Sequence, residues 1–148
     1  MLTLADAATR AALTARIQAL APNAAARWGR MQAPEMLAHC RDSMRMAYGE
    51  LYCAPKRVSL ARLGVSKWLV LRVLPFPKGA PTAPELVARR PDPWDVERDA
   101  LVGLIARFDL ERARGTWPAH PLFGNLTYEQ WGQLGWKHLD HHLRQFGV

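Results

Sequence analysis

The sequence predicts an all-α fold, a four-helix bundle in which residues 1–148 form a single domain. Three observations favour it. Four segments carry apolar residues at helical spacing between helix start and stop signals, and no segment alternates apolar and polar residues between hairpin turns. A hydrophobic fraction of 49% with six tryptophans in 148 residues is enough for one buried core.

The first two helices are expected in the N-terminal third of the chain. An alanine-rich helix over about residues 3–20 carries leucines and an isoleucine on one stripe. The second helix begins at "APEMLAHC", where Pro34 suits the first helical position and Glu35 complements the helix dipole. It is expected to run to about Gly49 or Tyr52.

The last two helices have clearer start signals. "DPWDVERDALVGLIARF" offers Asp92 as N-cap and Pro93 as first helical residue, with basic residues in the last turn before Gly115. Thr127, followed three positions later by a glutamine, matches a capping box at "LTYEQW". This final helix is expected to run to about Phe146.

Residues 54–91 separate the second helix from the third. Within them "KRVSLARLGVSKWLVLRVL", residues 56–74, predicts a short extra helix. The following "PFPKGAPTAPELVARRPDP" is a proline-rich crossover, because its repeated prolines prevent a continuous helix. The predicted bundle therefore has one long connection between its second and third helices.

The composition favours a cytoplasmic protein with no membrane span. Cys40 and Cys53 have no paired-motif spacing, which is typical of a reducing compartment rather than of a disulfide scaffold. The N-terminal "MLTLADAATRAALTAR" is too polar for a signal peptide. The longest apolar run, near "WLVLRVLPF", is shorter than the ~20 residues that a membrane span needs.

The net charge of +7 is concentrated in residues 41–90, where ten Lys and Arg residues accompany three acids. Such a segment is compatible with nucleic acid, an anionic membrane or an acidic ligand. An ordinary solvated surface is favoured, because aromatic residues do not interleave with the basic ones as base stacking requires. Nucleic acid is therefore disfavoured as a partner.

Three of the five histidines lie in the last eleven residues, at His138, His141 and His142. Residues i and i+4 of a helix lie about 40° apart around its axis, so His138 and His142 share a face. His141 is about 100° away from His142 and is expected to stay outside their site. The shared face continues a stripe through Trp131 and Leu134, which predicts that it points toward the core.

His39 is the expected third ligand, because it lies on a stripe of the second helix with Met36 and Met46. If the two helices pack side by side, three neutral imidazoles surround one ion. That arrangement suits Zn²⁺ or Ni²⁺ and leaves positions open for water or substrate. The spacing alone also fits histidines on an ordinary helix surface. Cys40 is expected to be a small buried hydrophobe, and Ser43 to bond to its own helix backbone rather than act in the site.

The remaining histidines and tryptophans receive structural interpretations. His120, in the loop "PAHPLFGN", is expected to pack within that loop, with a place near the mouth of the site as the alternative. His141 is expected to face solvent, with a role beside the ligands or in a subunit contact as alternatives. Trp131 and Trp136 cannot both face inward, which indicates an apolar outer surface on the last helix and a homodimer.

"MLAHC" on the second helix, together with the terminal "HLDHHLRQF", resembles the DinB-like superfamily of metal-binding four-helix bundles. Its members carry one histidine on the second helix and an H-x-x-H-H or H-x-x-x-H element on the last, followed by glutamine. These positions match His39, His138, His142 and Gln145. "HPLFGNLTYEQWGQLGWKHLDHHLRQFGV" and "PFPKGAPTAP" are similar to a branch of the superfamily described only as a domain of unknown function.

The resemblance implies a metal site at His39, His138 and His142. Some members resemble transferases or isomerases that act with a low-molecular-weight thiol such as bacillithiol, mycothiol or glutathione, and the resemblance implies such an activity here. An ion with open positions lowers the pKa of a bound thiol, or activates water for hydrolysis. No residue is an obvious general base, since Asp42 and Glu50 are not clearly on the His39 stripe. The competing interpretation is a non-catalytic, stress-related protein that binds a metal or small ligand.

Overall fold

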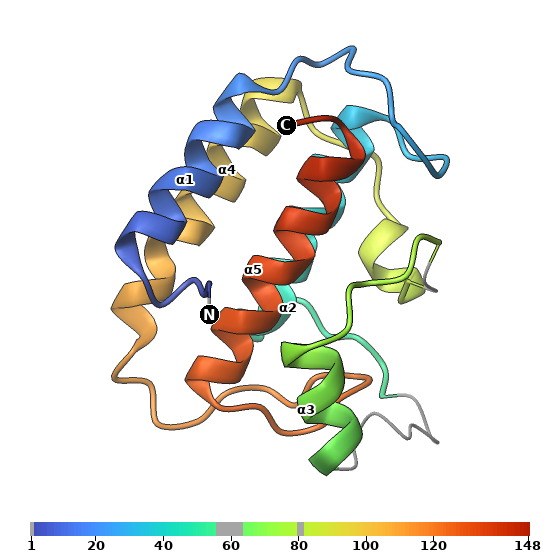
Figure 1. The fold of residues 1–148 in the computed structure, drawn as a ribbon. Helices are drawn as coiled ribbons and strands as arrows, with labels where there is room; N and C mark the ends of the chain where they lie inside the picture. The colour runs from blue at the N-terminus through green and yellow to red at the C-terminus, as the bar shows by residue number, and fades with distance from the viewer. Residues whose placement is uncertain (1, 56–63, 80–81) are drawn as a thin grey trace.

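The computed structural model describes residues 2–55, 64–79 and 82–148, and over these residues the chain is helical with no strand (Figure 1). The described residues form five α-helices and two 3-10 turns. The α-helices are α1 (Ala7–Ala19), α2 (Ala33–Tyr48), α3 (Gly64–Arg72), α4 (Trp94–Arg107) and α5 (Tyr128–Gln145). The 3-10 turns are η2 (Pro84–Val87) and η3 (Phe108–Glu111). The all-α prediction is confirmed.

The four longer helices enclose the core. Helix α2 packs against α4 and α5, while α1 packs against the same two helices (Figure 1). Helix α3 packs against α5 and confirms the extra helix between the second and third long helices. The first part of that expected helix, residues 56–63, lies outside the described residues. No helix in the described part of the chain has the length and apolar character needed to cross a membrane.

Helix α1 begins later than the alanine-rich pattern predicted. Its N-cap is Asp6, whose Oδ2 accepts hydrogen bonds from the backbone N–H of Thr9 at 2.9 Å and from its hydroxyl at 2.6 Å. A carboxylate in this position satisfies donors that the helix leaves free, so it fixes the start at Ala7. The expected stripe of Leu13 and Ile17 is buried.

Helix α2 begins one residue before the expected Pro34, which is therefore its second residue. Gln32 is the N-cap, and its N–H donates to the Glu35 carboxylate at 2.8 Å in a capping box. The helix ends at Gly49, whose φ of 79° is left-handed and suits a residue without Cβ. The earlier of the two expected ends is therefore confirmed.

The boundaries of the third long helix differ from those expected. Pro93, not Asp92, is the N-cap of α4, and the Asp92 N–H instead donates to the Glu97 carboxylate at 2.8 Å. The Asp92 carboxylate pairs with Arg41 rather than capping the helix, so the first turn of α4 has no side-chain cap. The α-helix ends at Arg107 and continues only as η3, because its apolar stripe ends there and Leu110 is 83% exposed.

Helix α5 starts as predicted and lies close to the N-terminal segment. The hydroxyl of Thr127 accepts from the Gln130 N–H at 3.3 Å, and the Gln130 side chain accepts from the Thr127 N–H at 3.0 Å. One turn later the carbonyl of Gly132 accepts from the Leu4 N–H at 3.1 Å. A Cβ on Gly135 would lie 2.6 Å from the Leu4 side chain, so glycine here allows the close approach.

The outer face of α5 is less apolar than its tryptophans indicated. Trp136 is partly buried and packs against the core, so it does not form the expected exposed surface. Large exposed apolar side chains instead gather on and just after α3, at Val65, Trp68 and Val73. The homodimer inferred from α5 stays a prediction.

Candidate metal centre

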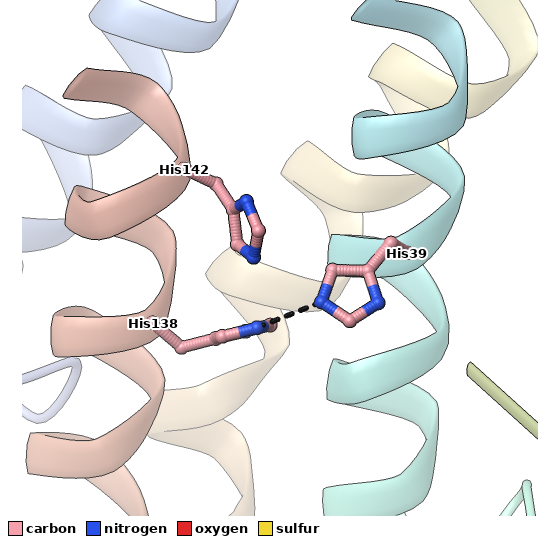
Figure 2. Close-up of side chains that lie close together, drawn as sticks. All are labelled: His39, His138 and His142. Carbon is pink, nitrogen blue, oxygen red and sulfur yellow. Dashed lines mark hydrogen bonds between the residues drawn. The ribbon is translucent and has the colours of Figure 1, made fainter. Parts of the chain in front are cut away.

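Three histidine side chains meet between α2 and α5. His39 projects from α2, while His138 and His142 project from α5 one turn apart (Figure 2). The Nε2 atoms of His39 and His138 lie 2.9 Å apart, and one ring nitrogen from each of the three lies within 4.8 Å of the others. These are the residues that the sequence predicted as ligands. Among the described residues, no other group of three or more histidines, cysteines or carboxylates has this geometry.

The spacing of the three nitrogens fits a small divalent ion. Two nitrogens bound at ~2.0–2.1 Å to a tetrahedral ion lie roughly 3.3 Å from each other. The separation of 2.9 Å between His39 and His138 is slightly shorter than this, and 4.8 Å bounds the remaining separations. Modest rotations of the imidazoles would therefore place the three nitrogens on one ion.

A backbone carbonyl orients the ring of His39. Its Nδ1–H donates to the carbonyl oxygen of Leu86, in η2, at 3.2 Å. This hydrogen bond puts the ring proton on Nδ1 and leaves the lone pair on Nε2, which faces His138. The site side of His39 is thereby prepared to bind a cation.

A charge cluster holds the crossover in place behind His39. The guanidinium of Arg89 donates to the Asp42 carboxylate of α2 at 2.8 Å and also pairs with Glu97 of α4. Both carboxylates are almost completely buried. Arg89 lies three residues after Leu86, so its pairs with α2 and α4 keep the Leu86 carbonyl against His39.

A glutamine orients His142 in the same way. The Nδ1–H of His142 donates to the side-chain oxygen of Gln145 at 2.8 Å, and the Gln145 amide donates to the Trp28 carbonyl at 2.7 Å. Gln145 is only 4% exposed. Gly29 makes this contact possible, because a Cβ there would lie 2.7 Å from the Gln145 amide nitrogen. The two hydrogen bonds leave Nε2 of His142 free for the site.

All three imidazoles are held in the neutral form that coordination requires. Burial lowers the pKa of His39, and it lowers the pKa of His142 to about 3 with help from the neighbouring His39. Burial, followed by the proximity of His142 and His39, holds the pKa of His138 well below its usual value. At neutral pH each ring therefore keeps one nitrogen lone pair for a cation instead of binding a second proton.

The histidines border a cavity of about 670 Å³. Its other walls are mainly apolar and come from the N-terminal segment, the loop before α2, α2, the crossover, η3, the loop before α5 and α5. They include Leu4, Met44, Phe76, Phe108, Trp131 and Leu134. None of the described residues that line it is an aspartate or a glutamate. A ligand in this space would reach the open side of the three-histidine cluster.

The acids and the hydroxyl considered in the sequence differ in their surroundings. Asp42 is buried in the charge cluster, and Glu50 pairs with Arg107, so neither lines the cavity. Ser43 does line the cavity, and its hydroxyl forms no hydrogen bond within the described residues, contrary to the expected bond to its helix. The expectation that no carboxylate serves as a general base therefore holds for the cavity wall.

Cys40 behaves as the small buried hydrophobe predicted. It is 1% exposed, its thiol donates to the Met36 sulfur at 3.6 Å, and burial raises its pKa. A thiol whose ionisation is this unfavourable is a poor ligand and a poor nucleophile. Cys53 is also buried, with a raised pKa that has the same main cause.

The two remaining histidines lie around the cavity. Nδ1 of His120 accepts hydrogen bonds from the N–H groups of Leu122 and Phe123 at 3.0 and 3.2 Å, which confirms loop packing, and the residue also lines the cavity. His141 is partly buried rather than solvent-facing, with its ring 5.7 Å from Trp28 and 6.0 Å from Phe76. Its removal from the solvent follows from these aromatic neighbours, which are distant in sequence.

Several parts of the site carried no usable signal in the sequence. The Leu86 carbonyl is a backbone atom, so no residue type indicates it. Trp28 and Phe76 approach α5 only through the folded loops that hold them. Gln145 was identified only through the resemblance, although its spacing of three from His142 places it on the same face of a helix.

Comparison with known families gives one match that covers nearly the whole chain. A family model described as "Protein of unknown function (DUF1569)" matches residues 4–147. No curated protein and no solved structure matches the chain. The match agrees with the resemblance to a domain of unknown function, while the wider DinB-like relationship stays a prediction.

Proposed function

The chain belongs to the DUF1569 family of proteins of unknown function, and from the geometry of its site we propose that it binds a divalent metal ion. The ligands are Nε2 of His39, His138 and His142, and the ion is Zn²⁺ or Ni²⁺, since neutral imidazoles suit these borderline ions. The proposal places the chain among DinB-like four-helix bundles.

One observation carries this proposal. Nδ1 of His39 and Nδ1 of His142 both donate to fixed oxygen atoms, so their Nε2 atoms converge with His138 on one point. Histidines buried only to fill a core need no shared focus. Oxygen partners on the far ring nitrogen are the usual support of metal-binding histidines.

We further propose that the site serves a transferase acting with a low-molecular-weight thiol. A divalent ion in this position would lower the pKa of a bound thiol, which supplies a nucleophile at neutral pH without a protein base. The chain supplies the three ligands, and its apolar cavity wall excludes water from the sulfur. In the transfer itself, a sulfur–carbon bond forms, the bond to the leaving group breaks with its electron pair, and the thiol proton passes to solvent.

The absence of a carboxylate from the described cavity wall favours the thiol over hydrolysis. Activating water for hydrolysis is generally assisted by a residue that accepts its proton, and Asp42 and Glu50 are engaged elsewhere. The same feature supports a second candidate, a non-catalytic protein that holds a metal or a small ligand. Cytoplasmic location and a homodimer complete the proposal.

Elemental analysis and a turnover assay test these proposals in sequence. Protein purified without a metal-affinity tag should contain about one equivalent of zinc or nickel. Glutathione, bacillithiol and mycothiol are then each mixed with an activated aryl halide and the metal-loaded protein. Thioether formation that is lost in His142→Ala supports the transferase. Stoichiometric metal without turnover for any thiol supports the binding protein, and absence of metal after reconstitution contradicts both.

A further inference from the structure

The cavity has cationic side chains at its edge and no carboxylate on its described walls. Arg30 lines the cavity and is exposed, and it forms no ion pair or hydrogen bond within the described residues. Nζ of Lys78 lies 4.6 Å from the ring centre of Trp28, which also lines the cavity. Arg30 therefore lines the cavity and Lys78 lies against one of its lining residues, and neither has a carboxylate partner within the described residues.

Arginines on the opposite side of α2 have different surroundings. Arg41 and Arg89 face Asp42, Asp92 and Glu97, and each pairs with at least two of these carboxylates. Their positive charges are neutralised within the protein. The charge of Arg30 has no such partner, so it is available to an anion that approaches the cavity.

The interior of the cavity, unlike its cationic edge, suits an apolar group. Its walls beyond the histidines are mainly aliphatic, thioether and aromatic side chains, contributed among others by Met44, Phe108 and Leu134. Its volume of about 670 Å³ lies within the range of small-molecule sites. Burying apolar surface of a ligand here is favourable, because that surface is removed from water. Burying an anionic group here is unfavourable, because the interior offers no cation apart from a bound ion.

We propose that the cavity binds a small amphiphilic anion, an apolar body carrying one carboxylate or sulfonate. The apolar body occupies the interior, and the anionic group stays at the edge against Arg30 and Lys78. The body then passes beside His39, His138 and His142. This inference names the class of ligand for the proposed function. Any reaction of that ligand at the metal rests on the proposed function, but its binding to the cavity needs no metal.

Metal-free protein and three probes that each carry a ten-carbon chain test the inference. Decanoate, 1-decanol and decyltrimethylammonium share a chain and differ in charge, and their binding is measured by calorimetry after treatment with chelator. We expect decanoate to bind at least about tenfold more tightly than decanol, and the ammonium probe to bind weakest. Arg30→Gln should weaken decanoate about fivefold and leave decanol unchanged.

Two further variants locate the binding. Arg72→Gln removes an exposed charge from α3 that does not line the cavity, so it should leave decanoate affinity unchanged. Ser43→Phe places a ring in the cavity and should weaken decanoate and decanol together, with circular dichroism confirming the fold. The inference is overturned if decanoate binds no more tightly than decanol, or if Arg72→Gln weakens decanoate binding as much as Arg30→Gln does. It is also overturned if Ser43→Phe is folded and binds both probes with wild-type affinity.

The same variants separate this inference from the proposed function. Arg30→Gln should retain wild-type metal content, because Arg30 touches none of the three ligands. His142→Ala, measured without metal, should still prefer decanoate to decanol. A protein that takes up no metal but shows this preference would refute the metal site and leave the ligand class standing. A protein that binds metal but does not prefer decanoate to decanol would refute the ligand class and leave the metal site standing.

Discussion

The carbonyl oxygen of Leu86 lies 3.2 Å from Nδ1 of His39, although 47 positions separate the two residues in the chain. This contact joins the proline-rich crossover to the candidate ligand on α2. It fixes which nitrogen of His39 carries the proton, and therefore which nitrogen faces His138. The crossover thus orients a candidate ligand through a backbone atom, while its Phe76 side chain lines the adjoining cavity.

Removing any ligand should empty the metal site. We expect His39→Ala, His138→Ala and His142→Ala each to lower bound zinc or nickel strongly, because two imidazoles hold an ion far less tightly than three. Metal content after dialysis against a weak chelator measures the loss. His141→Ala is the matched control on the same helix and should stay close to wild type. Loss in this control with retention in His142→Ala would mean that the wrong α5 histidine has been assigned to the site.

Gln145 should tune the affinity of the site without touching the ion. Gln145→Met removes the oxygen that accepts from His142 while keeping a similar volume, so metal affinity should fall roughly 10–100-fold. Competition with a chromogenic chelator measures it. Gln145→Glu keeps an accepting oxygen and should lose much less. Equal affinities for the two variants would show that orientation of His142 through this hydrogen bond contributes nothing.

Acid should destabilise the metal-free protein through its buried histidines. Burial lowers the pKa of His120 to about 4, below the ~6.5 of an exposed histidine. Between these values the unfolded chain binds the extra proton, so stability falls as the pH drops from about 6.5 toward 4. From pH 7.5 to 4.5 this residue alone should lower the free energy of unfolding by roughly 2 kcal/mol.

His120→Asn isolates that contribution. Its side-chain oxygen can replace Nδ1 as acceptor for the N–H groups of Leu122 and Phe123, but it does not titrate. Urea unfolding at several pH values, with chelator present, should show a shallower acid loss in this variant than in the wild type. Parallel curves for the two proteins would mean that His120 takes up its proton equally in the folded and unfolded states.

The charge cluster behind His39 should matter for both stability and metal binding. Arg89→Met leaves the buried carboxylates of Asp42 and Glu97 with fewer partners, which should cost about 3 kcal/mol in the free energy of unfolding. Metal affinity should fall as well, because Leu86 is less firmly held. Arg98→Met is the control, since within the described residues Arg98 pairs only with the exposed Asp95 and Asp99, and its effect should be below about 1 kcal/mol. Similar unfolding midpoints for the two variants would contradict this account.

Local patterns predicted the fold where local interactions determine it. Thr127 and Gln130 bond to each other within one turn, so the start of α5 could be identified from four letters. The predicted start of α4 was wrong because the carboxylate of Asp92, the expected cap, pairs with Arg41 from another helix. Its end was wrong because burial of Phe108 and exposure of Leu110 depend on the whole fold.

In the site, too, some features are set by local geometry and were predicted from it, while others depend on tertiary packing. The shared face of His138 and His142 follows from helix geometry alone, whereas the approach of His39 required the packing of α2 on α5. The cavity was beyond prediction, since its shape depends on side chains from segments that are far apart in the chain. The aromatic surroundings of His141 were missed for the same reason.

The ring nitrogens that meet at 2.9 Å belong to residues 99 positions apart, on helices near opposite ends of the chain. An ion held by both would act as a reversible cross-link that closes a loop of most of the polypeptide. Because closing so long a loop is entropically costly, the three nitrogens converge only after α2 and α5 have docked, so the ion binds late in folding rather than starting it. Once bound, it would couple the local opening of the two helices, and amide hydrogen exchange in both would slow together as metal concentration rises.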